Sequence, residues 1–302
     1  MKKHFKYYVF AIILIVVAVY SCKNANNDAE TILKGTSKII VDESLKPIIE
    51  DQIAVFENTY EAKINLITQS ENECVLSLTK GVADIIVLPR QLTKEEEAII
   101  KQKKIIPRTT QFAKDAIAFI RNKKSNDSLI SVDNIVAFLG GKPSSIKGLV
   151  FDNPNSSSAN FIAKLAGLNG LPDKGVFSFK TNEEVIKYVA ENEGMIGVVG
   201  VNWLSQPSLE LMEVIKNITV LSVKAVNSDE YIYPSQENIA TGLYPLARDL
   251  YIINCQGYEG LGMGFASFIS GEKGQRIILK SGLVPVRMPG RNIKTRNQLE
   301  TK

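Results

Sequence analysis

Histidine is nearly absent from this chain of 302 residues, since His4 is its only example. Cysteine is scarce too, with Cys22, Cys74 and Cys255 alone. Hydrolases of the Ser-His-Asp type and proteases of the Cys-His type need histidine as a general base, and most zinc enzymes need it as a ligand. Because so few cysteines make no metal site either, we expect no enzymatic activity, no metal and no other cofactor.

The positions of Cys74 and Cys255 leave the state of these two thiols open. They either pair in an oxidising compartment or lie buried separately, because their separation along the chain says nothing of their distance in space. We favour two separately buried thiols.

A strong excess of charge of either sign is also missing. Residues 1–21 hold three of the 36 lysines and arginines and none of the 32 acids, so the rest carries 33 bases against 32 acids. Binding of nucleic acid through a basic surface needs a clear positive excess, so we expect no nucleic-acid partner. A hydrophobic fraction of 45% over this length fits one large globular domain or two of ordinary size.

The N-terminus has the pattern of an export signal. Three lysines precede an apolar run over residues 7–19, which is short for a membrane span. The letters "VYSC" that end at Cys22 are similar to the lipobox of bacterial lipoproteins. This similarity implies a signal peptide over residues 1–21, palmitate-type lipidation of Cys22, and a polar tether over residues 22–33. The protein would then be lipid-anchored in the cell envelope, facing the periplasm or at the cell surface; an uncleaved N-terminal anchor is the alternative.

The next part of the chain alternates between strand and helix patterns. Helical spacing puts five apolar side chains on one face of the first helix, and these are Leu45, Ile48, Ile49, Ile53 and Phe56. The predicted strands are 38–41, 62–68 and 83–88, and the predicted helices are 44–60, 71–80 and 93–103. Three strand-helix units in about 70 residues indicate an α/β fold with a parallel sheet.

Two long extended runs, residues 112–122 and 247–254, interrupt this alternation. A second α/β set lies between them, and further helices follow the second run. The predicted elements are helices 131–139, 156–166, 182–191, 261–270 and 272–280, and strands 148–151, 195–199 and 283–286. The pattern indicates two lobes with crossover strands between them.

Ligands of open parallel sheets bind where strands end and helices begin, so the polar residues at these corners are candidates. Ser44 follows the first strand, and Ser70 follows the second with Glu73 at the spacing of a capping box. Thr93 and Glu96 repeat that spacing after the third strand. Helix capping alone explains each of these residues equally well, because the free N–H groups of a helix need partners with or without a ligand.

The corner "FDNPNSSSANF" carries more hydroxyls than a cap requires. Asn155, Ser156, Ser157 and Ser158 compete there for a single helix turn. An anion at a helix N-terminus meets exposed N–H groups and the positive end of the helix dipole, and hydroxyls complete its coordination. We interpret this corner as an anion cradle. A solvated polar loop is the alternative. The sequence has no serine-hydrolase motif and no suitable histidine that would make these serines nucleophiles.

Arg90 follows a strongly apolar strand and immediately precedes a helix. A guanidinium binds carboxylates and phosphates through paired donors, so Arg90 is a candidate ligand contact. A side chain that faces solvent is the alternative interpretation.

Five stretches in the same order resemble the phosphate-type substrate-binding proteins of bacterial ABC importers, in their lipoprotein form. Together they extend from residue 38 to residue 286, and no one of them is specific alone. They are "ADIIVLPRQLTKEE", "FAKDAIAFIRN", "FDNPNSSSANF", "YPLARDLYIIN" and "FASFISGEKGQRIILKSGLVPV".

The resemblance implies a two-lobe periplasmic binding protein fold, type II-like, in which two crossover strands act as the hinge. Lobe I would comprise residues 34–112 plus 230–302, and lobe II residues 113–229. The implied function is capture of inorganic phosphate or a related oxyanion by a monomer, which delivers it to the permease subunits of an ABC importer. A ligand sensor or scaffold lipoprotein of the same fold is the alternative.

The charged positions depart from the family pattern. The family has a carboxylate at the end of the third strand and an arginine before the hydroxyl loop, whereas this chain has Pro89 and Asp152 there. One hypothesis is that the charges have exchanged lobes, with Arg90 as the cation and Asp152 as the proton acceptor. The alternative is that Asp152 turns outward and the ligand differs. The resulting candidate ligand contacts are Ser44, Ser70, Arg90, Asp152, Asn155, Ser156, Ser157 and Ser158.

Overall fold

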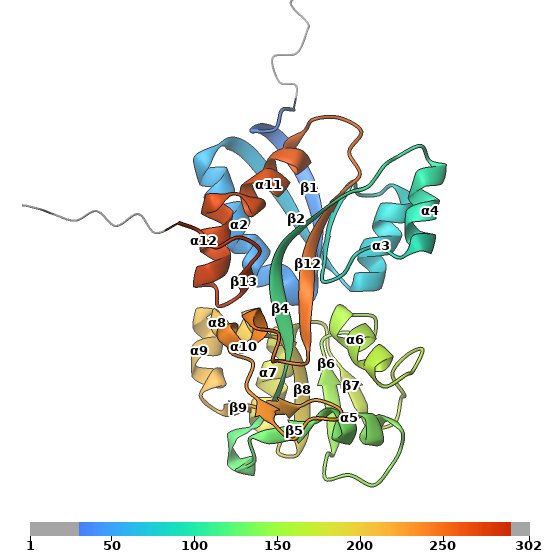
Figure 1. The fold of residues 1–302 in the computed structure, drawn as a ribbon, viewed down its shortest axis with the longest axis vertical. Coiled ribbons are helices and arrows are strands. Elements are labelled where there is room, and N and C mark those ends of the chain that lie inside the picture. The colour runs from blue at the N-terminus through green and yellow to red at the C-terminus, as the bar shows by residue number, and fades with distance from the viewer. Residues whose placement is uncertain (1–29, 291–302) are drawn as a thin grey trace, which may run out of the picture.

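The computed structural model describes residues 30–290, and its ribbon divides into two α/β halves, one above the other in Figure 1. Cys22, the predicted signal peptide and most of the predicted tether lie outside the described residues. Within residues 30–290, no helix has both the length and the hydrophobicity needed to cross a bilayer.

The first half is built on the parallel strands that the sequence predicts. The strand order is β2, β1, β3, β12, with β12 antiparallel to β3. These strands are β1 (Lys34–Asp42), β2 (Glu61–Gln69), β3 (Ile85–Leu88) and β12 (Ala247–Asn254). The helices are η1 (Glu43–Leu45), α2 (Lys46–Thr59), α3 (Glu71–Lys80), α4 (Lys94–Gln102), α11 (Leu261–Ser270) and α12 (Glu272–Lys280).

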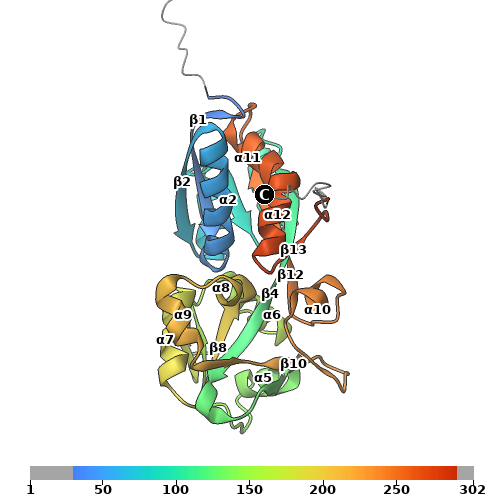
Figure 2. The same ribbon diagram turned by 90° about the vertical axis from the view of Figure 1, so that its left-hand side faces the viewer.

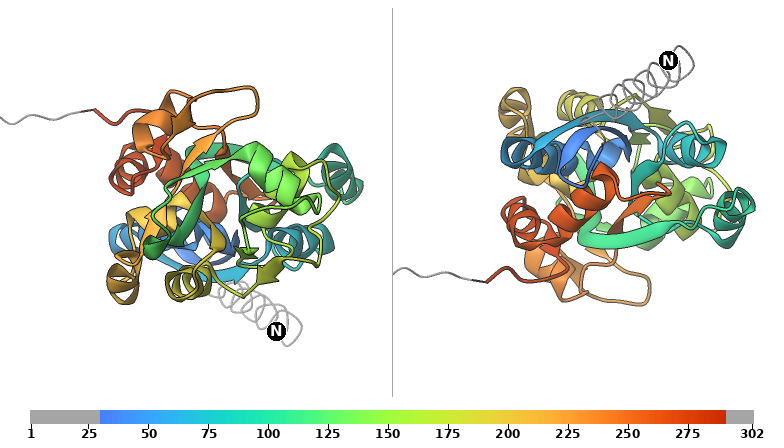
Figure 3. Two further views of the ribbon diagram at one scale, coloured as in Figure 1. Left: turned by 90° about the horizontal axis from the view of Figure 1, so that it is seen from below. Right: turned by 90° about the horizontal axis from the view of Figure 1, so that it is seen from above.

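Helices cover both faces of this sheet, with α2, α11 and α12 on one side and α3 and α4 on the other (Figure 3). The predicted apolar face of the first helix is confirmed, because all five of its side chains are buried, with Leu45 in η1 and the other four in α2. Phe56 packs against Phe265 and Phe268 of α11, with ring centroids 5.4 and 5.3 Å apart. This aromatic contact joins the N-terminal and C-terminal parts of the chain in one core.

The second half surrounds its own strands and core. Its main strands are in the order β4, β8, β6, β7, and β9 pairs with β4. The strands are β6 (Gly148–Phe151), β7 (Val176–Ser178), β8 (Met195–Gly200) and β9 (Ile218–Val220), with a small sheet of β5 (Leu129–Ser131), β10 (Ser222–Lys224) and β11 (Tyr231–Ile232). The helices are η2 (Lys123–Ser125), α5 (Val132–Leu139), α6 (Ser157–Leu165), α7 (Asn182–Glu191), α8 (Val201–Ser205), α9 (Leu209–Ile215) and α10 (Gln236–Ala240).

Two strands run through both halves, as the long extended runs predict. β4 (Arg108–Asn122) pairs with β12 and with β13 (Val284–Pro285) in the first half and with β8 and β9 in the second. Figures 1 and 2 show β4 and β12 passing from one half to the other. The crossover strands inferred from the sequence are therefore present.

Residues after 230 contribute more to the second half than the predicted lobe boundary allows. Ile239, Tyr244 and Leu246 lie in the core of the second half, and the Tyr244 hydroxyl donates to the Ile117 carbonyl at 2.8 Å. This packing favours a boundary at the start of β12, near Ala247, in place of residue 230. The sequence prediction missed α9, α10 and several short strands because elements of two to seven residues show no clear period.

Cys74 and Cys255 are free thiols that lie buried in the same apolar cluster. Burial raises the pKa of Cys255 to about 11, and it raises the pKa of Cys74 further. The structure therefore agrees with two unpaired, unreactive thiols.

Candidate ligand-binding site

The end of β1 and the start of α6 face each other between the halves of the molecule. β1 ends at Asp42, and the short helix η1 that follows it presents Ser44. From the second half, α6 points its N-terminus at this position, with Ser157 in its first turn. Asp42, Ser44 and Ser157 are all buried, and their atoms are in direct contact.

Two hydroxyls and one guanidinium meet at this contact. The Oγ atoms of Ser44 and Ser157 are 3.1 Å apart. Arg248 of β12 donates from Nη1 to Ser157 Oγ at 2.9 Å and from Nη2 to Ser44 Oγ at 3.0 Å. One arginine on a crossover strand therefore bonds to hydroxyls from both halves. We call Ser44, Ser157 and Arg248, together with Asp42, the central cluster.

Asp115 holds Arg248 in place. The two residues are directly opposite each other on β4 and β12, and Arg248 Nη2 lies 3.0 Å from Asp115 Oδ2. Both side chains are almost fully buried, at 3% and 0% exposure. Burial raises the pKa of Asp115, while the charge of Arg248 opposes that rise. The pair keeps a cation in the interior, where an isolated charge would be costly.

Asp42 places a carboxylate on the N-terminus of α6. Its Oδ1 accepts from Ser157 Oγ at 2.7 Å and from the Ser44 backbone N–H at 3.1 Å, and Ser44 Oγ also donates to it. Its Oδ2 accepts from the backbone N–H of Ser157 at 3.3 Å. These donors are of the kind that hold a bound oxyanion at a helix N-terminus.

Two further buried acids lie beside the central cluster. Burial, with the nearby charge of Asp42, raises the pKa of Asp152 to about 7. Burial and the charge of Asp152 raise the pKa of Glu43 to about 8, although hydrogen bonds from Asn182 oppose the rise. Low polarity and like charges therefore favour the protonated forms of both carboxyls near neutral pH.

Several polar contacts around the cluster join the two halves. Asn182 of α7 donates to Glu43, and Asn202 of α8 donates from Nδ2 to the Ser44 carbonyl at 2.8 Å. At the opposite rim, Asn160 Nδ2 lies 3.1 Å from Glu71 Oε1. The halves are therefore closed on each other in this structure.

A groove of about 1040 Å³ leads from the surface to Ser157 and Arg248. Arg90, Phe161 and Tyr251 also line it. Within residues 30–290, no group of three or more metal-binding side chains is arranged to hold a metal ion. The groove is much larger than one phosphate ion, so a small solute can enter it from the surface.

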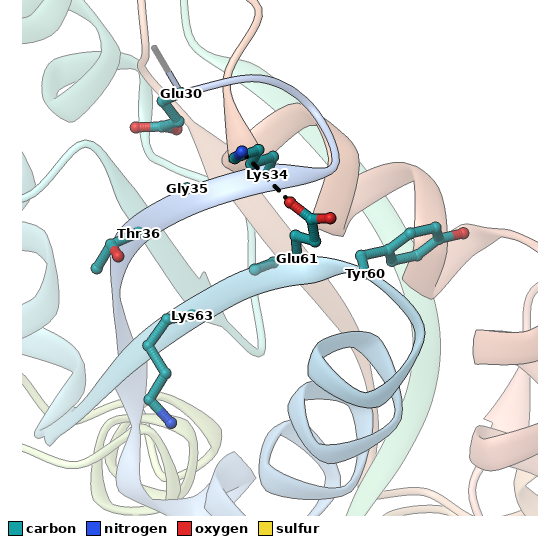
Figure 4. A pocket seen from close by; sticks show the side chains of 8 residues that line it. Glu30, Lys34, Gly35, Thr36, Tyr60, Glu61 and Lys63 are labelled. Atoms are coloured by element: carbon teal, nitrogen blue, oxygen red, sulfur yellow. Dashed lines mark ion pairs between the residues drawn. The ribbon is translucent and has the colours of Figure 1, made fainter. Parts of the chain in front are cut away.

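A second pocket, of about 660 Å³, lies at the amino ends of β1 and β2 (Figure 4). The ion pair between Lys34 and Glu61, at 3.4 Å in this pocket, is exposed to solvent. Asp42 stands at the other end of β1. Water weakens the attraction between charges at such an exposed position. This pocket is therefore a poor candidate for binding a charged ligand.

The hydroxyls of the predicted anion cradle have different environments. Ser157 belongs to the central cluster, whereas Ser156 caps α6 by accepting from the Ala159 N–H at 3.2 Å. Ser158 is buried, and its Oγ has no hydrogen-bond partner among the described residues. Asn155 is exposed and contacts Asn72 of the first half, with 3.4 Å between Nδ2 of Asn72 and Oδ1 of Asn155.

Ser70 forms the capping box that its spacing predicts. Its Oγ lies 2.6 Å from Glu73 Oε2, and its backbone N–H donates to the same oxygen at 2.9 Å. Hydrogen bonding of Ser70 is thereby explained by the cap of α3. In contrast to Ser70, Ser44 belongs to the central cluster, where its hydroxyl lies beside that of Ser157.

Arg90 lines the groove with its guanidinium paired to acids. Its Nε lies 2.9 Å from Glu71, and its Nη1 and Nη2 lie 2.8 and 3.0 Å from Glu96. Burial opposes the charge of Arg90, but the hydrogen bonds and charges of Glu96 and Glu71 raise its pKa. The cation bonded to the hydroxyls is Arg248 instead.

Asp152 is fully buried and does not turn outward. Neither of its carboxyl oxygens has a hydrogen-bond partner in the described part of the chain. Its side chain lies near Asp42 and Glu43. The charge of Asp42 raises the pKa of Asp152, and the charge of Asp152 raises the pKa of Glu43. The exchange hypothesis for Arg90 and Asp152 stays a prediction, and the geometry adds Arg248 and Asp42 as candidates.

The sequence prediction missed the roles of Asp42, Asp115 and Arg248, although a signal was present. Each of the two long runs carries two adjacent charges of opposite sign, Lys114 and Asp115 in one and Arg248 and Asp249 in the other. A charge in a buried strand needs a partner of opposite sign. If the two runs are neighbouring strands, a charge in one therefore predicts an opposite charge in the other. That neighbourhood is a tertiary fact, which no local pattern contains.

A family model described as PBP superfamily domain matches residues 26–273. The chain belongs to this family. The periplasmic binding protein fold agrees with the two α/β halves and their crossover strands, as the resemblance in the sequence predicted. No curated protein matches the chain.

Solved structures with this fold include phosphate-binding proteins. A putative phosphate ABC transporter substrate-binding protein from Clostridium perfringens, with bound phosphate, is 19% identical at a TM-score of 0.69, covering 84% of this chain and 100% of its own. An ABC-type phosphate transport receptor from Vibrio cholerae is 16% identical at a TM-score of 0.63, covering 83% and 100%. The similarity at this identity is one of fold.

The same fold also occurs in a regulatory protein. The CcmR regulatory domain of Synechocystis PCC6803, in complex with 2-PG, is 14% identical at a TM-score of 0.53. It covers 78% of this chain and 96% of its own. The fold therefore serves both transport and regulation, and function has to be argued from the site.

Proposed function

We propose that this protein captures inorganic phosphate or a related oxyanion outside the cytoplasm and delivers it to the permease of an ABC importer. The observation that carries the proposal is the convergence of Ser44, Ser157 and Arg248 from two halves and a crossover strand. A guanidinium and hydroxyls at a helix N-terminus bind an oxyanion through several charge-assisted hydrogen bonds. The two structures of phosphate-binding proteins with this fold support the choice of ligand.

Binding would proceed by closure of the halves about the crossover strands. Ser44 approaches from the first half and Ser157 from the second, so neither half alone presents both hydroxyls. An oxyanion that bonds to both would stabilise the closed state relative to the open one. The protein performs no chemistry in this account, and the predicted lipid on Cys22 keeps it at the membrane near the permease.

Calorimetry on the full chain in detergent tests the proposal. The protein is dialysed free of phosphate and titrated with phosphate, sulfate and small carboxylates. We expect phosphate to bind and Arg248→Ala to weaken binding at least a hundredfold, because the variant loses the cation. Binding of no oxyanion by the wild-type protein or by the Asp42 variants described below would contradict the proposal.

A sensor or scaffold of the same fold is the second candidate function. The observation that favours it is the carboxylate of Asp42, which already accepts the hydrogen bonds of Ser44 and Ser157. A cleft whose donors bond to the protein's own carboxylate suits a permanent protein contact better than repeated capture and release. Co-purification with permease subunits, and its loss when the ligand is removed, would separate transport from this alternative.

A further inference from the structure

We infer that Asp42 is a built-in anion, which occupies the oxyanion position of the cleft and holds the two halves closed without a ligand. The inference rests on the proposed function only where it concerns competition with a free oxyanion. Its structural part, closure by an internal carboxylate, stands on the contacts of Asp42 alone.

The contacts of Asp42 are those expected of a bound ion. Its two oxygens accept from one backbone N–H and one hydroxyl in each half of the molecule. The two donors of the second half, the N–H and Oγ of Ser157, belong to the first turn of α6. A carboxylate oxygen and a phosphate oxygen present the same acceptor to such donors, so the internal group uses the bonds that a solute would use.

The charge of Arg248 is also satisfied within the protein. Asp115 pairs with Arg248 directly, and Asp42 shares the hydroxyls of Ser44 and Ser157 with it. A free divalent anion entering here would meet the charge of Asp42 at short range in a buried setting. Like charges in such a setting repel strongly, so the oxyanion has to displace the carboxylate before it binds.

Asp42 is well situated to link the halves. It is the last residue of β1 in the first half, yet it accepts two hydrogen bonds from Ser157, which lies 115 residues later on α6. It is completely buried, so these bonds are shielded from water. Charge-assisted bonds of this kind are about twice as strong as neutral ones. Removing the carboxylate should therefore loosen the cleft as well as free the anion position.

The test compares the full-length wild-type protein with Asp42→Ser, which removes the charge but keeps a small polar group. Asp42→Asn is a second variant of nearly unchanged size, in case the serine variant does not fold. Asp84→Asn is the matched control, because Asp84 is an exposed aspartate of the same half, outside the groove. Phosphate binding is measured by calorimetry after dialysis against phosphate-free buffer.

Hydrogen exchange with mass spectrometry gives a second reading that needs no ligand. We follow the segment 151–161, which contains the Ser157 N–H that donates a hydrogen bond to Asp42. In the wild type and in Asp84→Asn we expect protection of this segment without phosphate and no further protection with it. In Asp42→Ser we expect at least tenfold faster exchange without phosphate, and recovery when phosphate is added.

The expected binding result is at least tenfold tighter phosphate binding by Asp42→Ser than by the wild type. Equal exchange of segment 151–161 in all proteins would overturn the inference, whatever their affinities. Weaker phosphate binding by both Asp42 variants would overturn it too, because Asp42 would then be a ligand contact. If exchange is faster in the Asp42 variants and no oxyanion binds to any protein, the inference stands and the proposed function fails.

Discussion

Arg248 and Asp115 lie opposite each other on the two strands that connect the halves, with 3.0 Å between Nη2 and Oδ2. The pair lies on the two strands that pass from one half to the other, so it would keep its place if the halves moved about these strands. Ser44 and Ser157 reach it from either side. This arrangement makes Arg248 the residue whose replacement should affect stability and ligand binding together.

Replacement of Arg248 by Met should destabilise the protein by about 3–5 kcal/mol, because Asp115 would be left buried without its cation. The double variant Arg248→Met, Asp115→Leu should recover most of that loss. Urea denaturation followed by circular dichroism measures both. If the loss of stability in the double variant equalled the sum of the losses in the two single variants, the two residues would not be coupled.

Ser157 and Ser158 form a matched pair for testing the central cluster. Ser157→Ala removes a hydroxyl that donates to Asp42 and accepts from Arg248, so it should cost about 1–3 kcal/mol of stability. Ser158→Ala removes a buried hydroxyl without a partner among the described residues, so its effect should be small or stabilising. Thermal denaturation of both variants tests the difference, and equal losses would contradict it.

Arg90 and Arg248 should differ in their effect on oxyanion binding. Arg90→Ala is expected to change phosphate affinity less than threefold, because Glu71 and Glu96 already bind the guanidinium. Arg248→Ala should weaken it at least a hundredfold. If binding by the wild type is too weak to measure, the comparison is made in the Asp42→Ser background. A larger loss from Arg90→Ala would restore Arg90 as the ligand cation.

Stability should fall as the pH rises from 5 to 8. The folded-state pKa values of Glu43 and Asp152 are raised to about 8 and about 7, above their values in an unfolded chain. The folded state therefore binds more protons in this range, and its stability decreases with pH until both groups are ionised. The acid that faces both groups, Asp42, adds to the repulsion.

The size of this pH effect is on the order of 3 kcal/mol for each of the two carboxyls, since one unit of pKa shift corresponds to about 1.4 kcal/mol. Glu43→Gln and Asp152→Asn should each flatten the fall in Tm between pH 5 and pH 8. Asp84→Asn serves as the control for charge alone. Unchanged slopes in both cleft variants would show that these carboxyls titrate normally.

Long, periodic segments allowed a good prediction of the fold from sequence. Helix 71–80 was predicted with the bounds that α3 has, and the apolar face of α2 was correct, because each repeat of 3.6 residues adds an independent constraint. The small sheet of β5, β10 and β11 was not predicted, since the pairing of β5 with β10, 93 positions later, leaves no local trace. The capping boxes at Ser70 and Thr93 were predictable because they are local.

The sequence by itself determined the α/β class, the two halves, the crossover strands and the hydroxyl-rich start of α6. Each of these follows from hydrophobic periodicity or from the chemistry of neighbouring residues. Only the tertiary structure decided which charges meet the hydroxyls. Arg248 and Asp42 are 206 positions apart, and their partnership depends on pairing of strands and on closure of the halves, which are long-range events. The physical reason is that burial and charge pairing act through space, whereas a sequence pattern records only what adjacent residues share.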